Sequence, residues 1–414
     1  MRQSFAKYHK NKKSSPLETL ELHIDKMVQG GKGLSKMPDG RICFVEGALP
    51  NENCLVQLTQ QKKDFAKGKC IKVLSKSPFR VEPRCPLYGR CGGCSLQHLD
   101  SKKQAEFLAQ VERENFKRIA HVDLPDNFKV HTGEPWHYRN RARIVNCGKV
   151  NGEYRYGFRE QESNNVVPLE DCPVLTHALN DFLKTTAPKI NAQEISLFDN
   201  GNGKVSYFYQ GMVPDDFKKI APAVVELNGK SIHSDASVFF QSNLELLPEL
   251  VAAIQEQCSK FSIEERKWLI DLFSGVGFFA TILQDQFERI TTVERDKKCQ
   301  KYADINLSKN SPAKSHTQVI ENISAPAEDW LAQNVVSMPA TLIVDPPRTG
   351  LPPTALTAIV QSSVKRMIYV SCDPVTLARD FLKLSQHGFR MEWAEGFAFY
   401  PQTPHLEMVA VLAR

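Results

Sequence analysis

The sequence contains no apolar run of the roughly 18 residues that a membrane-spanning helix requires. Its first residues, MRQSFAKYHKNKKSS, are basic but have no apolar core of the kind found in a secretory signal. Internal repeats and low-complexity tracts are also absent. These absences exclude a membrane-spanning helix and a repeat protein, and we expect a cytoplasmic protein that does not associate with membranes.

Cysteine, in contrast, is plentiful, with 11 residues among 414. The number is odd and the sequence shows no export signal, so metal binding or catalysis explains the cysteines better than a disulfide framework does. The hydrophobic fraction of 42% and the charged fraction of 24% are those of a globular protein. The length favours two or three domains.

Acidic residues are scarce near the N-terminus. Residues 1–80 contain 16 Lys and Arg against 7 Asp and Glu, whereas the whole chain has a net charge of only +6. A basic N-terminal part on a nearly neutral body indicates a polyanionic partner, most simply a nucleic acid. The alternative is an ordinary solvated surface.

The first part of the chain predicts a small β-barrel after a basic tail. Residues 1–16 have no apolar periodicity and are expected to be disordered. Residues 17–77 contain five short strand patterns, with residues 30–41 assigned to Gly-rich turns. Five strands in about 60 residues indicate a small barrel, of which the OB type binds nucleic acids.

The remainder predicts two further domains. Residues 78–230 mix strand patterns, including a hairpin around NGNGK, with a helix over residues 101–120 whose apolar face is Phe107, Val111, Phe116 and Ile119. Residues 231–414 alternate buried-type strands with helices, which indicates a Rossmann-like, doubly wound parallel sheet. The fold class is therefore multi-domain α/β, with a mixed α+β middle domain.

A strand joins a helix at 271–280, DLFSGVGFFA, through two glycines that allow a ligand to approach the backbone closely. The strict dinucleotide motif is absent, because Ala280 occupies the third glycine position. Glu294 ends the next strand, where an acidic residue binds ribose hydroxyls. The pair fits S-adenosylmethionine (AdoMet) as well as NAD, and an ordinary strand–turn–helix connection is the alternative.

Three further strand ends carry reactive groups. Asp345 begins the DPPRTG segment, Cys372 lies in VSCDP, and Glu407 precedes the last apolar strand in PHLEMVAVL. A thiolate adds readily to an electron-poor carbon such as carbon 6 of a pyrimidine, and a carboxylate beside it is a candidate general base. Taken alone, a single cysteine after a strand is more typical of a small core residue than of a nucleophile.

In this order, DLFSGVG, DPPRTG, VSCDP and PHLEMVAVL resemble motifs of the RNA uracil-5-methyltransferase family. Further segments of that family are matched by FFQSN, HYRNRAR, YGFRE and VVPLEDCPVL. Residues 20–75 resemble the TRAM domain, an RNA-binding, OB-like barrel. The resemblance covers nearly the whole chain after the tail, and it is closest to the 23S rRNA subgroup, which has both a TRAM domain and an iron–sulfur cluster.

The resemblance implies specific roles. Cys372 would be the nucleophile that adds to carbon 6 of uracil, and Glu407 the base that removes the proton from carbon 5. The cofactor S-adenosyl-L-methionine, with uracil beside it, would contact Gln241, Phe273, Phe278, Glu294, Glu328 and Asp345. Asn322 is an alternative to Glu328 at the third strand.

Four cysteines have the spacing of a metal site. Cys85, Cys91 and Cys94 form C-x5-C-x2-C, and Cys172 follows much later in EDCPVL. This spacing by itself admits a zinc ion or a [4Fe-4S] cluster. Members of the family that contain a cluster have this spacing, so the resemblance implies [4Fe-4S], in a structural or RNA-positioning role.

The expected partner is RNA, most simply 23S rRNA, bound by a monomer. Lysines of the barrel and a row formed by Arg139, Arg141 and Arg143 suit phosphates, and nearby Tyr138, Trp136 and Tyr156 are candidates for stacking on bases. The T-loop uridine of tRNA is the first alternative substrate. Cytosine-5 methylation would put its nucleophile after proline, but Ser371 precedes Cys372; a non-catalytic RNA-binding protein is the last alternative.

Overall fold

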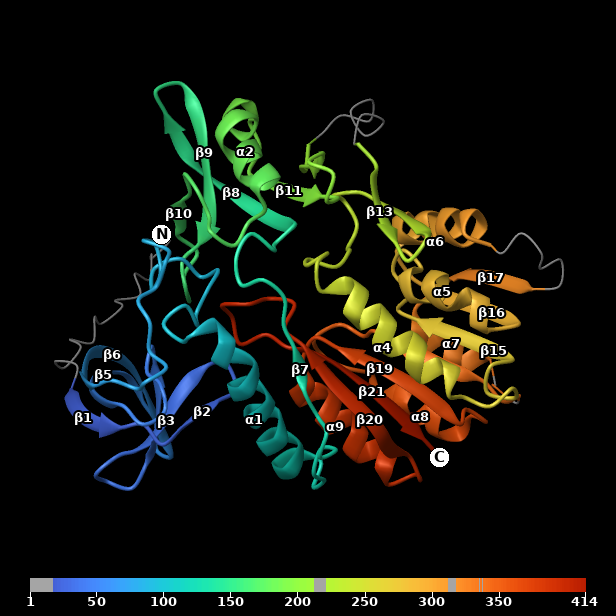
Figure 1. Cartoon of the computed structure of the whole chain (residues 1–414), viewed down its shortest axis with the longest axis horizontal. Coiled ribbons are helices and arrows are strands. Elements are labelled where there is room, and N and C mark those ends of the chain that lie inside the picture. The colour runs from blue at the N-terminus through green and yellow to red at the C-terminus, as the bar shows by residue number, and fades with distance from the viewer. Residues whose placement is uncertain (1–17, 212–220, 312–317, 335, 337) are drawn as a thin grey trace, which may run out of the picture. The chain divides into compact units, whose positions relative to one another are not determined.

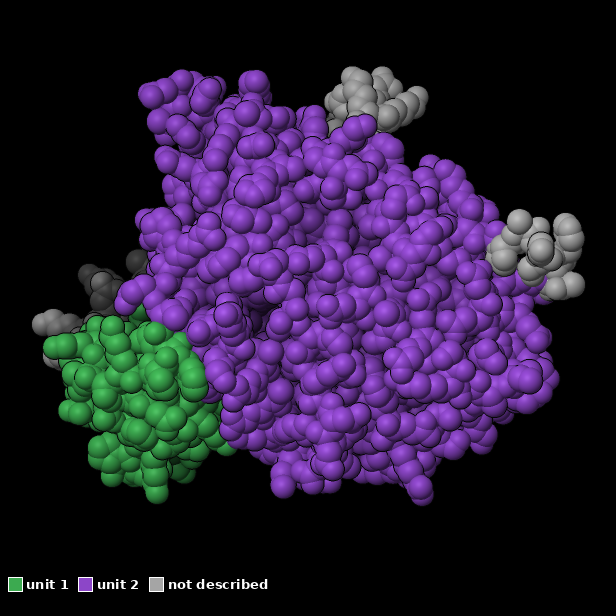
Figure 2. All heavy atoms as spheres, in the orientation of Figure 1, with its two compact units in different colours: residues 1–80 green, residues 81–414 purple. Residues whose placement is uncertain are grey.

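The computed structural model describes residues 18–211, 221–311, 318–334, 336 and 338–414 (Figure 1). The predicted disordered tail, residues 1–16, lies outside them. The chain divides into two compact units, residues 1–80 and 81–414 (Figure 2). The predicted boundary between a middle and a C-terminal domain falls inside the second unit and stays a prediction.

Unit 1 is built on one sheet of six strands, in the order β1-β5-β6-β4-β3-β2. The strands are β1 (Thr19–His23), β2 (Lys26–Val28), β3 (Lys32–Lys36), β4 (Ile42–Glu46), β5 (Asn53–Gln61) and β6 (Phe65–Ser75). All pairs are antiparallel except β4 with β6. Alternate residues of β5 are buried, as expected for a strand with one face on a core.

The assignment of residues 30–41 to turns alone is wrong, because β3 lies within them. The buried positions of β3 are Gly33 and Ser35, so the strand has no apolar alternation to detect. A side chain at Gly33 would come within 2.7 Å of Ile24, and only glycine fits against that neighbour.

Unit 2 begins with loops and a long helix, followed by a five-stranded antiparallel sheet in the order β10-β9-β8-β11-β12. Its elements are α1 (Ser101–Ile119), β8 (Arg141–Val150), β9 (Glu153–Arg159), β10 (Val166–Pro168), α2 (His177–Thr185), the 3-10 helix η1 (Ala187–Lys189), β11 (Glu194–Asp199) and β12 (Val205–Phe208). The predicted hairpin around NGNGK is confirmed by the pairing of β11 with β12.

A second, eight-stranded sheet has the order β17-β16-β15-β18-β19-β21-β20-β7. Its strands are β7 (Val130–His131), β15 (Trp268–Leu272), β16 (Arg289–Glu294), β17 (Val319–Ser324), β18 (Thr341–Val344), β19 (Arg366–Ser371), β20 (Arg390–Phe397) and β21 (Glu407–Ala413). The hairpin of β13 (Ala223–Leu227) and β14 (Lys230–Ser234) lies apart. The strands from β17 to β19 are parallel, which confirms the predicted Rossmann-like sheet, whereas β21 runs antiparallel to β19.

Helices cover both faces of this sheet. They are α4 (Leu247–Ser259), α5 (Phe278–Leu283), the 3-10 helix η2 (Gln284–Gln286), α6 (Lys297–Lys309), α7 (Ala327–Gln333), α8 (Pro353–Gln361) and α9 (Pro374–Ser385). One apolar core contains residues of α4, α5 and α6, and the other contains residues of α1, α7, α8 and α9. Within the described residues, no helix has the length and apolar character needed to cross a membrane.

Candidate active site

The predicted reactive residues meet at one edge of the eight-stranded sheet. Parallel strands end at a common edge, so Phe273, Asp345 and Cys372, which follow β15, β18 and β19, lie along it. β21 runs in the opposite direction and begins there. Its register pairs Ser371 with Met408. Cys372 and Glu407 are therefore at adjacent ends of neighbouring strands.

Burial and neighbouring charges shape the protonation of these groups. Burial, followed by the charges of Glu407 and Asp345, raises the pKa of the Cys372 thiol to about 11, and Arg348 opposes this shift. Burial and then Asp345 raise the pKa of Glu407 well above 4.5, again opposed by Arg348. Burial raises the pKa of Asp345 to about 7. The site is thus a partly buried thiol beside two carboxyl groups that hold protons more strongly than usual.

Arg348 is a residue that sequence reasoning passed over, although it belongs to DPPRTG. Its loop is fixed by Asp380, a fully buried residue of α9 whose Oδ2 accepts hydrogen bonds from the Leu351 N–H and the Tyr369 hydroxyl, both at 2.8 Å. Gly350, next in this loop, has no room for a side chain because Asp380 and Arg379 are within 2.5 Å of where a Cβ would lie.

The glycine loop after β15 has the features of a ligand-binding turn. Phe273 and Gly277 have φ angles of 60° and 72°, in the left-handed region. Asp271 is fully buried; its Oδ2 accepts from the Ala280 N–H at 3.0 Å, while its Oδ1 has no partner. Glu294 Oε2 accepts from the Gly275 N–H at 3.0 Å. A polar ligand at this turn would satisfy the unpaired oxygen.

The other predicted cofactor contacts differ in their surroundings. Phe278 is 5% exposed and packs edge-on against Phe240, so its side chain belongs to the core. Gln241 is buried and lies next to Phe240. Glu328 is partly buried in the first turn of α7, close to the end of β17. The roles of these residues stay predictions.

Asn322, the alternative at the third strand, has a structural role. Its Oδ1 accepts from the Thr292 hydroxyl at 2.7 Å, and its Nδ2 donates to Gln300 O at 3.0 Å and to Asp304 Oδ1 at 2.7 Å. These bonds join β16, β17 and α6, and they favour Glu328 over Asn322 as the residue available to a ligand.

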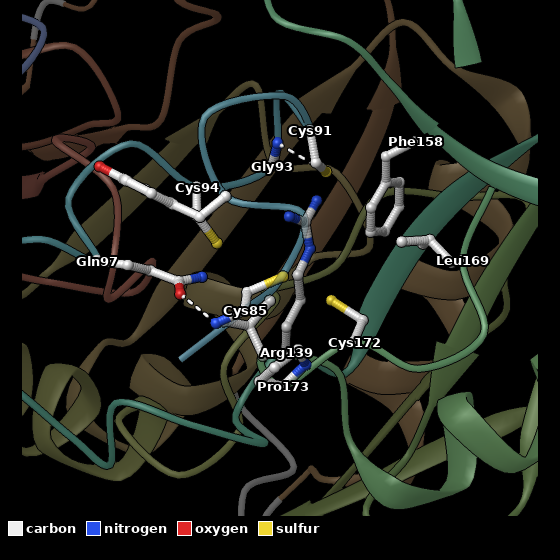
Figure 3. Close-up of a pocket in the computed structure, with 12 residues that line it drawn as sticks. Cys85, Cys91, Gly93, Cys94, Gln97, Arg139, Phe158, Leu169, Cys172 and Pro173 are labelled. Carbon is white, nitrogen blue, oxygen red and sulfur yellow. Dashed lines mark hydrogen bonds between the residues drawn. The ribbon is translucent and has the colours of Figure 1, made fainter. Parts of the chain in front are cut away.

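The four predicted metal-ligating cysteines line one pocket, although Cys172 is distant in sequence. Figure 3 shows the sulfur atoms of Cys85, Cys91, Cys94 and Cys172 around a shared space that also receives Arg139. The Gly93 N–H donates to Cys91 Sγ at 3.4 Å. Burial raises the pKa of Cys94 to about 12 and also raises those of Cys91 and Cys172.

Among the described residues, no three His, Cys, Asp or Glu side chains form a group that would hold a metal ion as they stand. The four cysteines line the same pocket, but no three of them form such a group. No carboxylate or imidazole lines this pocket.

Several predicted RNA contacts are wrong. Tyr138 is 5% exposed and donates its hydroxyl to Pro401 O at 2.8 Å, and Tyr156 donates to Ile190 O at 2.7 Å, so neither ring is available for stacking on a base. Arg141 packs over the Phe198 ring and donates to Val238 O at 2.6 Å. Arg143 is exposed beside Glu194. The arginine row is therefore divided between the interior and the surface.

The architecture, with a glycine loop at the edge of a Rossmann-like sheet that ends in the antiparallel strand β21, is consistent with an AdoMet-dependent methyltransferase fold. The family model described as tRNA (Uracil-5-)-methyltransferase matches residues 224–414. The chain is 31% identical over 450 residues to 23S rRNA (uracil(1939)-C(5))-methyltransferase RlmD of Shewanella sediminis, covering 98% of each chain. It is 30% identical over 422 residues to an uncharacterized RNA methyltransferase of Treponema denticola, covering 94% of this chain and 98% of the other.

A solved structure has a similar fold: the Pyrococcus abyssi tRNA (uracil-54, C5)-methyltransferase in complex with S-adenosyl-L-homocysteine, at a TM-score of 0.69 and 21% identity, covering 95% of this chain and 100% of that one. This chain belongs to the RNA uracil-5-methyltransferase family, as its motifs predict. It is an AdoMet-dependent enzyme that acts on RNA.

Proposed function

We propose that this enzyme methylates carbon 5 of a uridine in 23S rRNA through a covalent bond between the Cys372 sulfur and carbon 6 of the base. The observation that carries the proposal is the strand register, with Cys372 and Glu407 at adjacent strand ends. Relatives that are named as 23S rRNA methyltransferases match this chain over nearly their whole length, which favours rRNA as the substrate. The T-loop uridine of tRNA is the second candidate, because the family model and the similar solved structure are named for tRNA.

The reaction begins when the Cys372 sulfur bonds to carbon 6, which makes carbon 5 nucleophilic. Since the pKa of this thiol is raised to about 11, its proton has to leave as the bond forms. Of the two carboxylates that influence the thiol, Asp345 would accept this proton, because Glu407 has to stay ionised for the last step. AdoMet, when bound, would supply the methyl group that carbon 5 takes, and S-adenosyl-L-homocysteine would be left. Glu407 removes the remaining proton from carbon 5, the double bond re-forms, and the Cys372 sulfur leaves.

The cofactor would lie against the glycine loop. Asp271 Oδ1 and the Ser274 hydroxyl are both buried there without a partner and would receive donors of the ligand. The proposed contacts of the cofactor are Gln241, Phe273, Phe278, Glu294 and Glu328. Asp345 would contact both the cofactor and the uracil. Glu407 is only 7% exposed, so a base paired inside a helix would not reach it; the substrate is a uridine that can be flipped out of a loop.

The substrate is tested by methyl transfer from labelled AdoMet, using the full chain purified without oxygen. Separate 23S rRNA, 16S rRNA and tRNA from a strain that lacks such methylases are offered, and the products are digested to nucleosides. We expect label in 5-methyluridine of 23S rRNA. Label in tRNA alone would contradict the rRNA assignment and keep the chemistry, whereas no label in any RNA would contradict the proposed function.

Unit 1 is proposed to be a TRAM-type, OB-like barrel that binds RNA. Its six strands form a sheet with one buried face. Exposed or partly exposed lysines lie on and before β6, namely Lys62, Lys63, Lys67, Lys69 and Lys72. Cations in this arrangement are attracted to phosphates independently of sequence, so binding by this unit would weaken as salt rises.

We also propose that Cys85, Cys91, Cys94 and Cys172 hold a [4Fe-4S] cluster. Four thiols with no competing carboxylate or imidazole in the pocket suit iron–sulfur ligation. A tetrahedral zinc ion would require sulfur atoms within about 3.8 Å of one another, whereas a four-iron cluster accepts ligands farther apart. Arg139 in the same pocket would offset the negative charge of thiolate ligands. The cluster would join the segment of residues 85–94 to the segment that contains Cys172, and it would take no part in methyl transfer.

The cluster predicts a brown protein with about four irons per chain after purification without oxygen. Cys94→Ser is expected to lower the iron content and the visible absorbance, because it replaces one ligand of the pocket. Cys147→Ser is the matched control, since Cys147 is a partly exposed thiol of β8 outside the pocket. A colourless wild-type protein that contains one zinc would contradict the assignment.

A further inference from the structure

One face of helix α1 carries a line of buried residues. Gln104, Leu108 and Glu112 are spaced by four, so they stack along the helix, and they are 4%, 3% and 1% exposed. Two of the three are polar. The mechanism above gives neither of them a role, and each contacts a segment that carries a proposed catalytic residue.

Gln104 binds the loop between β20 and β21, which leads directly into Glu407. Its Oε1 accepts from the Gln402 N–H at 2.9 Å, and its Nε2 donates to Gln402 Oε1 at 3.0 Å. Gln402 has a φ of 69°, a backbone conformation that residues other than glycine rarely adopt. The paired bonds from Gln104 therefore stabilise a turn that the loop would not hold by itself.

The same loop is held at two more points. Leu108 packs with Ala398 and Leu406, near its two ends. The Gln402 carbonyl accepts from the Ser95 and Leu96 N–H groups at 3.0 and 2.9 Å. Those donors directly follow Cys94. The loop before Glu407 is thus held at its ends and its middle by residues of the segment 95–108, which follows the cysteine pocket and includes the start of α1.

The far end of the line lies near Asp373, the residue that follows the proposed nucleophile. Glu112 is close enough to Asp373 for their charges to repel, which adds to burial in raising the pKa of Glu112 to about 7. Asp373 directly follows Cys372 and caps α9, accepting from the Val375 N–H at 3.1 Å. Phe116, one turn further, shares an apolar core with residues of α9. Figure 1 shows α1 running beside α9.

We propose that helix α1 aligns the two catalytic segments with each other, and that Gln104 is the residue that positions the loop carrying Glu407. This inference rests on the proposed function, because it requires Glu407 to be the base. Gln104 is a positioning residue: it bonds to Gln402 in the loop before Glu407, and its Nε2 also donates to the Leu96 and Leu99 carbonyls, both at 3.2 Å.

The test compares Gln104→Ala with Gln110→Ala in the full chain. Gln110 has the same side chain on the same helix but is exposed, so its loss changes no loop contact. Gln104→Ala is expected to lower kcat about tenfold to a hundredfold, as a displacement of about 1 Å of a catalytic group does. The Kd for AdoMet should be unchanged. Since removal of the carbon 5 proton becomes the slow step, the covalent RNA–protein adduct should accumulate on a denaturing gel.

Gln104→Met is the second variant, because it keeps the side-chain volume and removes the hydrogen bonds. The inference is overturned if both variants match Gln110→Ala, if kcat falls without more adduct, or if turnover falls only in proportion to the folded fraction seen in thermal unfolding. If the wild-type enzyme itself makes no 5-methyluridine, the proposed function fails instead, which separates the two outcomes.

Discussion

Replacing Cys372 with alanine is expected to abolish methyl transfer and to leave binding of RNA and AdoMet intact. The sulfur is the proposed bond partner of carbon 6, and without it carbon 5 does not become nucleophilic. Removal of a covalent nucleophile costs on the order of 10³-fold or more in turnover. Incorporation of labelled methyl groups measures the loss, and filter binding with labelled RNA measures what remains.

The substitution should do little to the fold, because the neighbours of Cys372 are fixed without the thiol. The Ser371 hydroxyl donates to Asp373 O at 2.9 Å and accepts from the Asp373 N–H at 3.2 Å. Asp373 in turn caps α9. Cys147→Ala, which removes another partly exposed thiol, is the control and should keep full turnover. Residual turnover of Cys372→Ala near the wild-type value would remove this residue from the mechanism.

The strands that carry the site were predictable because they are buried on both faces. Every residue of β15 and β18 is buried, and except for Asp271 and Thr341 these residues are apolar, so both strands are recognisable as mainly apolar segments next to the motif residues. Because these strands alternate with helices along the chain, they are expected to be parallel, and Asp345 and Cys372, which follow two of them, are expected at the same edge of the sheet. The position of Glu407 required the structure, because β21 is antiparallel and its register with β19 is not encoded in local pattern.

Helix α1 illustrates what pattern alone does not give. The sequence predicts an apolar face that includes Phe107 and Ile119, but both are only partly buried, whereas Gln104 and Glu112 are buried. A periodicity of apolar residues assumes that a helix packs against apolar side chains. Here the partner is the backbone of an irregular loop, whose amide and carbonyl groups need polar partners. A buried glutamine meets this need, and nothing in the local sequence distinguishes it from an exposed one.

Glu407→Gln is expected to trap the covalent intermediate. The amide has the shape of the carboxyl group and keeps its place opposite Phe397 at the start of β21, but it does not accept the carbon 5 proton. Addition of the sulfur and methyl transfer would proceed, while elimination would stop. With RNA and AdoMet present, a denaturing gel should show a slowly migrating RNA–protein species that the wild-type enzyme does not accumulate. Glu256→Gln, on the exposed surface beside Lys260, should behave as wild type.

The same variant tests the electrostatics of the site. Burial and then Asp345 raise the pKa of Glu407 well above 4.5, so the base form increases as pH rises and wild-type turnover should rise with it. The folded state holds this proton more strongly than the unfolded state, so ionisation of Glu407 costs stability as pH rises above 4.5 toward the folded-state pKa. Glutamine does not ionise, and thermal unfolding of the variant should lose this part of the pH dependence. If stability changes in this way but no adduct forms, another residue is the base; Asp345, with a pKa raised to about 7 beside the same thiol, is then the first to replace.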